Sequence, residues 1–194
     1  MKILCINLQE RRDRLDHFKK EFYKTKFGSE FILIKAIKHS IGYAGCKMTY
    51  LSIFEQFKNE NMLIIFEDDV LFLDNFNENF LKSFNQLPKN WDMLYLGGNP
   101  QQPQKRYSDN LFLGNNIFTT HAIVYNNQRG IFQHILNSGE RINKIDVFFA
   151  NEIQRDFCCF LAYPMIATQY DNPSDICKNS DYSMIEKNYK KFCQ

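Results

Sequence analysis

Short apolar runs alternate along the chain with segments in which apolar residues recur every three or four positions. The short runs predict β-strands, which we place at residues 2–8, 31–37, 63–66, 93–96, 111–113, 120–125 and 159–163. The periodic segments predict helices at residues 12–24, 48–57, 76–84, 129–136 and 147–155. Strands that alternate with helices are typical of βαβ units. We therefore predict an α/β fold with a mostly parallel central sheet flanked by helices.

The chain length bounds the number of domains. A chain of 194 residues is long enough for one well-buried core and short for two. There is no internal repeat and no Gly/Ser-rich linker, so we expect one domain over residues 1–177. Residues 178–194 are expected to form a C-terminal tail, and the polar chain from Asp171 onward is expected to wrap over the surface or stay loose. Residues 99–110 are expected to form a polar loop.

The charge pattern excludes some classes of protein. The formal net charge is +2 and the basic residues are scattered, which argues against a nucleic-acid binder. The apolar start of the chain is interrupted by Asn7 too soon for a signal peptide. The apolar stretch at residues 157–167 contains Pro164 and falls short of the ~20 residues that a membrane span needs. We expect no membrane anchor and a cytoplasmic location.

The six cysteines show no metal-binding spacing such as C-x-x-C. Without a secretory signal, the default is reduced thiols in a cytosol-like compartment. Cys177 and Cys193 form the one pair for which a disulfide is worth testing.

Three adjacent acids, Glu67, Asp68 and Asp69, end the apolar run of the central predicted strand. In open α/β sheets ligands bind at the carboxyl ends of strands. Adjacent carboxylates repel one another unless a cation or hydrogen-bond donors compensate them, and Mg²⁺ and Mn²⁺ prefer such oxygen ligands. The alternative is a polar turn in which Asp68 or Asp69 caps a neighbouring element. The triplet alone does not decide between them.

Two further segments lie where helices begin. Arg11, Arg12 and Arg14 open the first predicted helix, where cations oppose the helix dipole. An anion held there by Arg11 or Arg14 would explain this placement, but ion pairs with neighbouring acids on a solvated face are favoured by the spacing alone. Residues 42–46 form a Gly-rich segment that matches neither a P-loop nor a dinucleotide fingerprint, and a tight turn is favoured there.

The remaining candidates are single residues near strand ends. Trp91 precedes a strand that finishes on Gly97 and Gly98; the tryptophan is favoured as a core residue, and the glycines could leave space for a ligand. His121 opens a strand on the ligand side, where a structural role is favoured over metal or phosphate binding. Asp146 lies at a helix start, where an N-cap is favoured over a general base.

In this order the segments resemble glycosyltransferase family 25, which includes lipooligosaccharide galactosyltransferases, collagen β-galactosyltransferases and giant-virus relatives. The first matching motifs are I-N-L-x-x-R-x-D-R at residues 6–14, G-x-x-G-C at residues 42–46, Glu67-Asp68-Asp69 and W-D-x-L-Y-L-G at residues 91–97. The later ones are Thr120-His121-Ala122, Ile145-Asp146, Tyr163-Pro164 and Ser174-Asp175-Ile176. The resemblance thus covers roughly residues 2–177.

The resemblance implies a single GT-A-like (Rossmann-like) domain that transfers a sugar from a nucleotide diphospho-sugar. Glu67, Asp68 and Asp69 then stand in the place of the metal-binding D-x-D motif. Asp69 would bind Mn²⁺ or Mg²⁺ directly, and Glu67 or Asp68 would contact metal-bound water or the donor ribose. His121 would be a further contact to the metal or the diphosphate.

The resemblance also implies how the substrates are bound. Arg11 and Arg14 would face the nucleotide, and Asn7, Gly97 and Gly98 would belong to the nucleotide-sugar site. The donor would be UDP-galactose or UDP-glucose, and the acceptor a hydroxyl of a glycan or a glycosylated protein.

A base is implied by the inverting chemistry of the family, and the resemblance assigns this role to Asp146. One departure from the family is clear: the Ser-His pair that commonly follows G-x-x-G-C is Thr49-Tyr50 here. A catalytically impaired sugar-binding module on the same fold therefore stays an alternative. A metal-dependent phosphohydrolase or nuclease built on the acidic cluster, with Asp146 and Asp92, is another.

Overall fold

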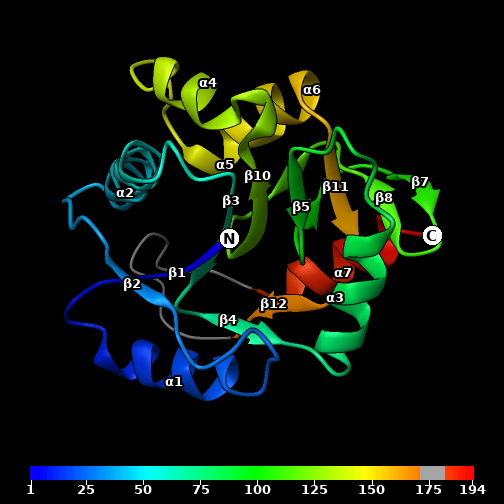
Figure 1. Cartoon of the computed structure of the whole chain (residues 1–194), viewed down its shortest axis with the longest axis horizontal. Helices are drawn as coiled ribbons and strands as arrows, with labels where there is room; N and C mark the ends of the chain where they lie inside the picture. The colour runs from blue at the N-terminus through cyan, green and yellow to red at the C-terminus, as the bar shows by residue number, and fades with distance from the viewer. Residues whose placement is uncertain (171–181) are drawn as a thin grey trace.

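An eight-stranded sheet forms the centre of the computed structural model, which describes residues 1–170 and 182–194 (Figure 1). The strand order is β2-β1-β3-β10-β5-β11-β8-β7. The bounds are β1 (Lys2–Asn7), β2 (Ile32–Lys35), β3 (Met62–Glu67), β5 (Met93–Tyr95), β7 (Lys105–Ser108), β8 (Leu111–Leu113), β10 (Ala122–Asn126) and β11 (Cys159–Ala162). Strands β10 and β8 run opposite to the other six, so the sheet is mainly parallel in strand direction.

Two small ladders supplement the sheet. Strand β4 (Val70–Phe72) pairs with β12 (Ala167–Gln169), and β6 (Asn99–Pro100) pairs with β9 (Ile117–Phe118). The first ladder begins directly after Asp69 and sets Gln169 opposite Val70. It therefore closes the carboxyl end of β3 on one side.

Helices cover both faces of the sheet (Figure 1). Their bounds are α1 (Arg12–Phe22), α2 (Gly42–Gln56), α3 (Phe76–Asn85), α4 (Ile131–Asn137), α5 (Ile145–Phe148), α6 (Gln154–Asp156) and α7 (Ser183–Phe192). A 3₁₀ turn (Asn127–Arg129) precedes α4, and a π-helical turn (Phe149–Ile153) joins α5 to α6.

Each face has its own apolar cluster. On one side α2 and α4 meet through Phe54 and Phe132, whose ring centroids are 5.1 Å apart. On the other side Phe18 of α1 and Phe76 of α3 belong to a second cluster. These clusters arise from the apolar stripes that predicted the helices, and they fix the helices to the buried strands between them.

The strand and helix order predicted from the sequence is confirmed, with local differences. The helix expected at residues 48–57 begins at Gly42, so the Gly-rich segment is its first turn and not a turn before it. A Cβ on Gly45 would lie 2.4 Å from the carbonyl oxygen of Ile37, so the helix approaches the preceding segment too closely for any side chain. The loop expected at residues 99–110 contains β6 and β7.

The predicted tail contains α7, which packs on the domain. Tyr189 is buried, and its hydroxyl donates a hydrogen bond to the carbonyl oxygen of Ala162 at 2.5 Å. The rings of Tyr163 and Tyr189 stack with centroids 6.5 Å apart. Residues 182–194 thus pack against the domain, and the predicted boundary between the domain and a tail at residue 177 stays a prediction.

The described cysteines, Cys5, Cys46, Cys158, Cys159 and Cys193, are free thiols. Cys177, considered as a partner for Cys193, and the Ser174-Asp175-Ile176 motif lie outside the described residues. None of the helices in residues 1–170 and 182–194 has the length and apolarity that crossing a membrane requires.

Candidate active site

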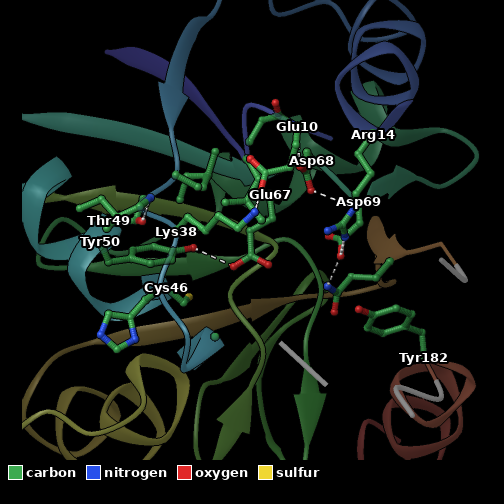
Figure 2. Close-up of a pocket in the computed structure, with 18 residues that line it drawn as sticks. Glu10, Arg14, Lys38, Cys46, Thr49, Tyr50, Glu67, Asp68, Asp69 and Tyr182 are labelled. Carbon is green, nitrogen blue, oxygen red and sulfur yellow. Dashed lines mark hydrogen bonds and ion pairs between the residues drawn. The ribbon is translucent and has the colours of Figure 1, made fainter. Parts of the chain in front are cut away.

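The acidic triplet lies at the carboxyl end of β3, beside the end of the parallel strand β1 (Figure 2). Ile6 of β1 is opposite Glu67 of β3, so the chain that leaves β1 runs past Asp68 and Asp69. A cavity of about 250 Å³ opens there. Its lining includes Asn7, Arg14, Tyr50, Glu67, Asp68, Asp69, Gln169 and Tyr182.

Arg14 is the counter-ion of the triplet. Its guanidinium forms ion pairs with both Asp68 and Asp69, with Nε 3.1 Å from Oδ1 of Asp68. The side chain of Arg14 is only 9% exposed, because α1 begins directly against the end of β3. The amide of Asn7 donates to Oδ2 of Asp68 at 2.6 Å and to the carbonyl oxygen of Arg11 at 2.9 Å. The fold therefore brings Asn7 and Arg14 to the acids, and their predicted contact with a nucleotide-sugar stays a prediction.

Arg11 forms an ion pair with a neighbouring acid, which the spacing of the helix start favoured over an anion site. Its Nη2 lies 3.0 Å from Oδ2 of Asp13, whose side chain is 60% exposed. Arg11 is absent from the lining of the cavity, although its carbonyl oxygen accepts from Asn7. The predicted contact of Arg11 with a nucleotide thus stays a prediction.

Glu67 is held by two hydroxyl groups. Its Oε1 accepts from Oγ1 of Thr120 at 2.6 Å and from the hydroxyl of Tyr50 at 3.1 Å. Burial raises the pKa of Glu67 to about 7, and the charge of Asp69 adds to this rise. Tyr50, in the position of the family histidine, is fully buried and serves as a donor to the acidic cluster.

Asp68 experiences opposing effects. The pKa of Asp68 is raised to about 6. Burial is the main cause and the charge of Asp69 adds to it, while the positive charge of Arg14 acts in the opposite direction. Asp68 and Asp69 share the guanidinium of Arg14, so two carboxylates lie against one positive charge. A site of this kind favours an additional cation.

Asp69 offers an oxygen for such a cation. Its Oδ2 is occupied by Arg14 and by Nε2 of Gln169 at 3.1 Å, while Oδ1 is buried and has no hydrogen-bond partner in the described chain. Among residues 1–170 and 182–194, no group of three or more His, Cys, Asp or Glu side chains is arranged to hold a metal. Mg²⁺ is usually held by one or two carboxylates together with substrate phosphates. The residues fit a cation shared with a diphosphate rather than one held by the protein alone.

His121 does not reach the cavity. It is fully buried, its Nε2 lies 3.4 Å from the carbonyl oxygen of Ala167, and Nδ1 has no partner in the described chain. Burial lowers the pKa of His121 to about 4, so the imidazole is neutral at pH 7. The ring faces β12 and does not line the cavity, and the predicted contact of His121 with a metal or diphosphate stays a prediction.

Gly97 and Gly98 make room for protein and not for a ligand. A Cβ on Gly97 would lie 1.7 Å from the carbonyl oxygen of Ala167, and one on Gly98 would lie 2.4 Å from Cγ2 of Ile117. The space that the glycines leave is therefore filled by neighbouring strands. The nucleotide-sugar contact expected at these glycines stays a prediction.

Asp146 lines a second cavity of about 220 Å³. The two cavities meet at Cys46, Glu67 and Gln169, which line both. Asp146 is the second residue of α5, and its Oδ1 accepts from the amide of Val147 at 2.9 Å. The N-cap position belongs to Lys144, so Asp146 is not the capping residue that the spacing alone favoured.

The decisive comparison is with a family model. The model described as Glycosyltransferase family 25 (LPS biosynthesis protein) matches residues 38–145. The chain belongs to glycosyltransferase family 25. No curated protein matches it.

Two solved structures resemble this family 25 glycosyltransferase. A glycosyltransferase involved in the glycosylation of the major capsid of PBCV-1 has a TM-score of 0.54 at 11% identity, over 82% of this chain and 80% of that chain. A Drosophila β1,4-galactosyltransferase 7 variant, in complex with manganese, UDP-Gal and xylobiose, has a TM-score of 0.49 at 11% identity, over 93% of this chain and 74% of that chain. The first likeness shows a shared fold, and the GT-A-like fold predicted from the sequence is confirmed.

The family 25 match covers only part of the site. Residues 38–145 include the acidic triplet and Tyr50, while Arg14, Asp146 and Gln169 lie outside the matched range. The sequence analysis missed Tyr50 and Gln169 as site residues. A buried tyrosine after a Gly-rich helix start carries a weak signal, and Gln169 carries none, because the β4–β12 pairing alone brings it to Asp69.

Proposed function

We propose that this glycosyltransferase transfers a hexose, galactose or glucose, from a UDP-sugar to a hydroxyl of a glycan or glycosylated protein, with inversion at the anomeric carbon. The observation that carries the proposal is the meeting of Arg14 with Asp68 and Asp69 in the wall of a cavity at the carboxyl end of β3. This is where open α/β sheets bind nucleotides.

The acids and Arg14 suit a nucleoside diphosphate with a divalent cation. Asp69 would hold Mn²⁺ or Mg²⁺ through Oδ1, which has no other partner in the described chain. Such a cation supplies Lewis-acid neutralisation of the diphosphate leaving group. Arg14 supplies a fixed positive charge at the same place, and Asn7 holds Asp68 in position by its hydrogen bond.

Asp146 is the proposed general base. The second cavity is lined by two carboxylates, Glu67 and Asp146, and of these Asp146 does not line the first cavity. The amide of Val147 already orients its Oδ1, which leaves Oδ2 for the proton of an acceptor hydroxyl. A base on the opposite side of the reacting carbon from the diphosphate is what in-line attack with inversion requires. A cytoplasmic location stays a prediction.

A donor screen tests this function. The purified protein is incubated with Mn²⁺ and each of several UDP- and GDP-sugars, and release of the nucleoside diphosphate is followed with and without sugar acceptors. We expect release from UDP-galactose or UDP-glucose that acceptors stimulate. Asp69→Asn should abolish it, whereas Asp16→Asn, at a side chain that is 69% exposed on α1, should leave it unchanged.

Calorimetry with UDP and Mn²⁺ separates the alternatives. If neither UDP nor any UDP-sugar binds, the transferase proposal is wrong. If the nucleotide binds but acceptors never stimulate its release, a hydrolase or a binding module describes the protein better.

A further inference from the structure

The second cavity has features that the donor site does not need. Its wall combines Tyr43 from the first turn of α2, Thr119 from the segment before β10, and Lys144 and Asp146 from the start of α5. It joins the first cavity at Glu67. A transfer between two substrates needs two adjoining sites, and the reacting atoms must meet at the junction.

Tyr43 presents an aromatic surface at this cavity. The residue is 36% exposed, although a large aromatic side chain ordinarily gains by burial. Nζ of Lys144 lies 5.4 Å from the centroid of its ring, which connects the start of α2 with the segment before α5. The ring is thus held in place without being covered.

Thr119 has an unfavourable backbone conformation. Its φ is 74°, in the left-handed region that a β-branched residue rarely adopts. Its Oγ1 is buried without a hydrogen-bond partner in the described chain. Strain of this kind often accompanies a binding or catalytic site, so it supports a functional cavity here.

The chemistry of the wall favours a sugar ring. The C–H face of a pyranose packs on an aromatic ring, and its hydroxyls bond to a carboxylate and an ammonium group, as Tyr43, Asp146 and Lys144 would allow. A second phosphate is disfavoured, because Asp146 and Glu67 outnumber the single lysine in the lining. An extended peptide is disfavoured too, because the lining includes no residue of β2 or β7, the two edge strands of the eight-stranded sheet to which it could add.

We propose that the second cavity is the acceptor subsite and binds the terminal pyranose ring of a glycan, packed on Tyr43 with its hydroxyls bonded to Asp146 and Lys144. This assignment rests on the proposed transferase function. In the transfer, the bond between the acceptor oxygen and the anomeric carbon forms while the bond from that carbon to the diphosphate breaks. The electron pair leaves with UDP, and the hydroxyl proton passes to Asp146.

Ligand-detected NMR tests the subsite without turnover. Saturation-transfer spectra are recorded for the methyl glycosides of galactose, glucose, mannose and N-acetylglucosamine, each with the protein, UDP and diamagnetic Mg²⁺. We expect at least one glycoside to bind, and we expect Tyr43→Ala to weaken its affinity by roughly tenfold or more. Tyr43→Phe keeps the ring and should bind nearly as the wild type. Tyr23→Ala, at an exposed tyrosine after α1, is the matched control and should have no effect.

The UDP signals in the same samples keep the two proposals apart. If UDP binds but no glycoside does, or if Tyr43→Ala binds glycosides as the wild type does, the acceptor assignment is wrong and the donor site stands. Binding of a serine- or threonine-containing peptide in place of every glycoside would also overturn it. If UDP fails to bind, the transferase function fails, and the acceptor role fails with it.

Discussion

The hydroxyl of Tyr50 lies 3.1 Å from Oε1 of Glu67, and this contact joins the buried core of α2 to the acidic triplet. The same hydroxyl lies 3.0 Å from the carbonyl oxygen of Thr120, so one proton faces two acceptors. A protonated Glu67 could donate to Tyr50 and satisfy both contacts. The tyrosine thus keeps a polar link at a position where the family commonly has a histidine.

Removing the Tyr50 hydroxyl should destabilise the fold and loosen the site. We expect Tyr50→Phe to cost about 1 kcal/mol of unfolding free energy, because Glu67 loses one of its two hydroxyl donors. Urea denaturation measures this cost. Tyr125→Phe is the matched control, because Tyr125 is also fully buried and its hydroxyl has no partner in the described chain. An equal cost for both variants would show that the Glu67 contact contributes nothing.

The raised pKa of Glu67 predicts a pH-dependent stability. Burial, with the charge of Asp69, raises this pKa from 4.5 to about 7, so the folded protein holds the proton more tightly than the unfolded chain. The stabilisation from this proton is complete below pH 4.5 and is lost as the pH rises through 7. We expect Glu67→Gln to be about 3 kcal/mol more stable than the wild type at pH 8, and this advantage to shrink toward pH 4.5.

Urea unfolding at pH 4.5 and pH 8 without divalent metal measures this difference. Glu55→Gln, at a side chain that is 61% exposed, controls for the substitution itself and should show no pH-dependent advantage. Two outcomes would contradict a raised pKa of Glu67. In one, the stability advantage of Glu67→Gln is the same at both pH values; in the other, the variant is less stable than the wild type at both.

The ion pairs of Arg14 predict that a divalent metal stabilises the protein more strongly when this arginine is removed. Arg14→Gln leaves Asp68 and Asp69 without their guanidinium, and breaking a buried ion pair in this way costs about 3 kcal/mol or more. Because Mn²⁺ can replace the missing charge, we expect it to raise the melting temperature of Arg14→Gln more than that of the wild type. Thermal unfolding in EDTA and in Mn²⁺ measures this difference.

The control for Arg14 is an exposed ion pair. Arg155→Gln removes a guanidinium that pairs with Asp156 at 2.7 Å, with 67% of the arginine side chain exposed. It should leave the stability nearly unchanged and should show no response to Mn²⁺. If Mn²⁺ raises the melting temperature of both variants equally, the metal acts at a site other than Asp68 and Asp69.

The sequence predicted the site where local patterns determine the structure. An apolar run that ends in three acids predicted β3 and the acids at its carboxyl end. The spacing of the arginines after β1 favoured ion pairs on a solvated face, which Arg11 forms with Asp13, and did not predict the burial of Arg14. The antiparallel insertion of β10 was not predictable, because periodicity carries no strand direction. Gln169 was not predictable either, since it reaches Asp69 across 100 residues of sequence through two three-residue strands.

The surroundings of His121 and Gly97 were not predictable for a related reason. Both residues follow or precede strands on the ligand side, as motif reasoning requires. However, β12 packs against them, and the carbonyl oxygen of Ala167 occupies the space beside both. A short strand that pairs late in the chain thus determines which residues of the sheet edge remain open to a ligand.

Asp146→Asn provides the sharpest test of the division between the two cavities. The amide oxygen of asparagine can still accept from the amide of Val147, so the start of α5 should keep its structure. Asparagine cannot take the proton of an acceptor hydroxyl, and we expect turnover to fall by roughly 10²–10⁴. Binding of UDP with Mn²⁺, measured by calorimetry, should stay at the wild-type level, because Asp146 does not line the first cavity.

Asp109→Asn, at an exposed acid before β8, should leave both quantities unchanged. If Asp146→Asn keeps near-normal turnover, the base is another group, and Glu67, the other carboxylate in the lining of the second cavity, would be the next residue to substitute.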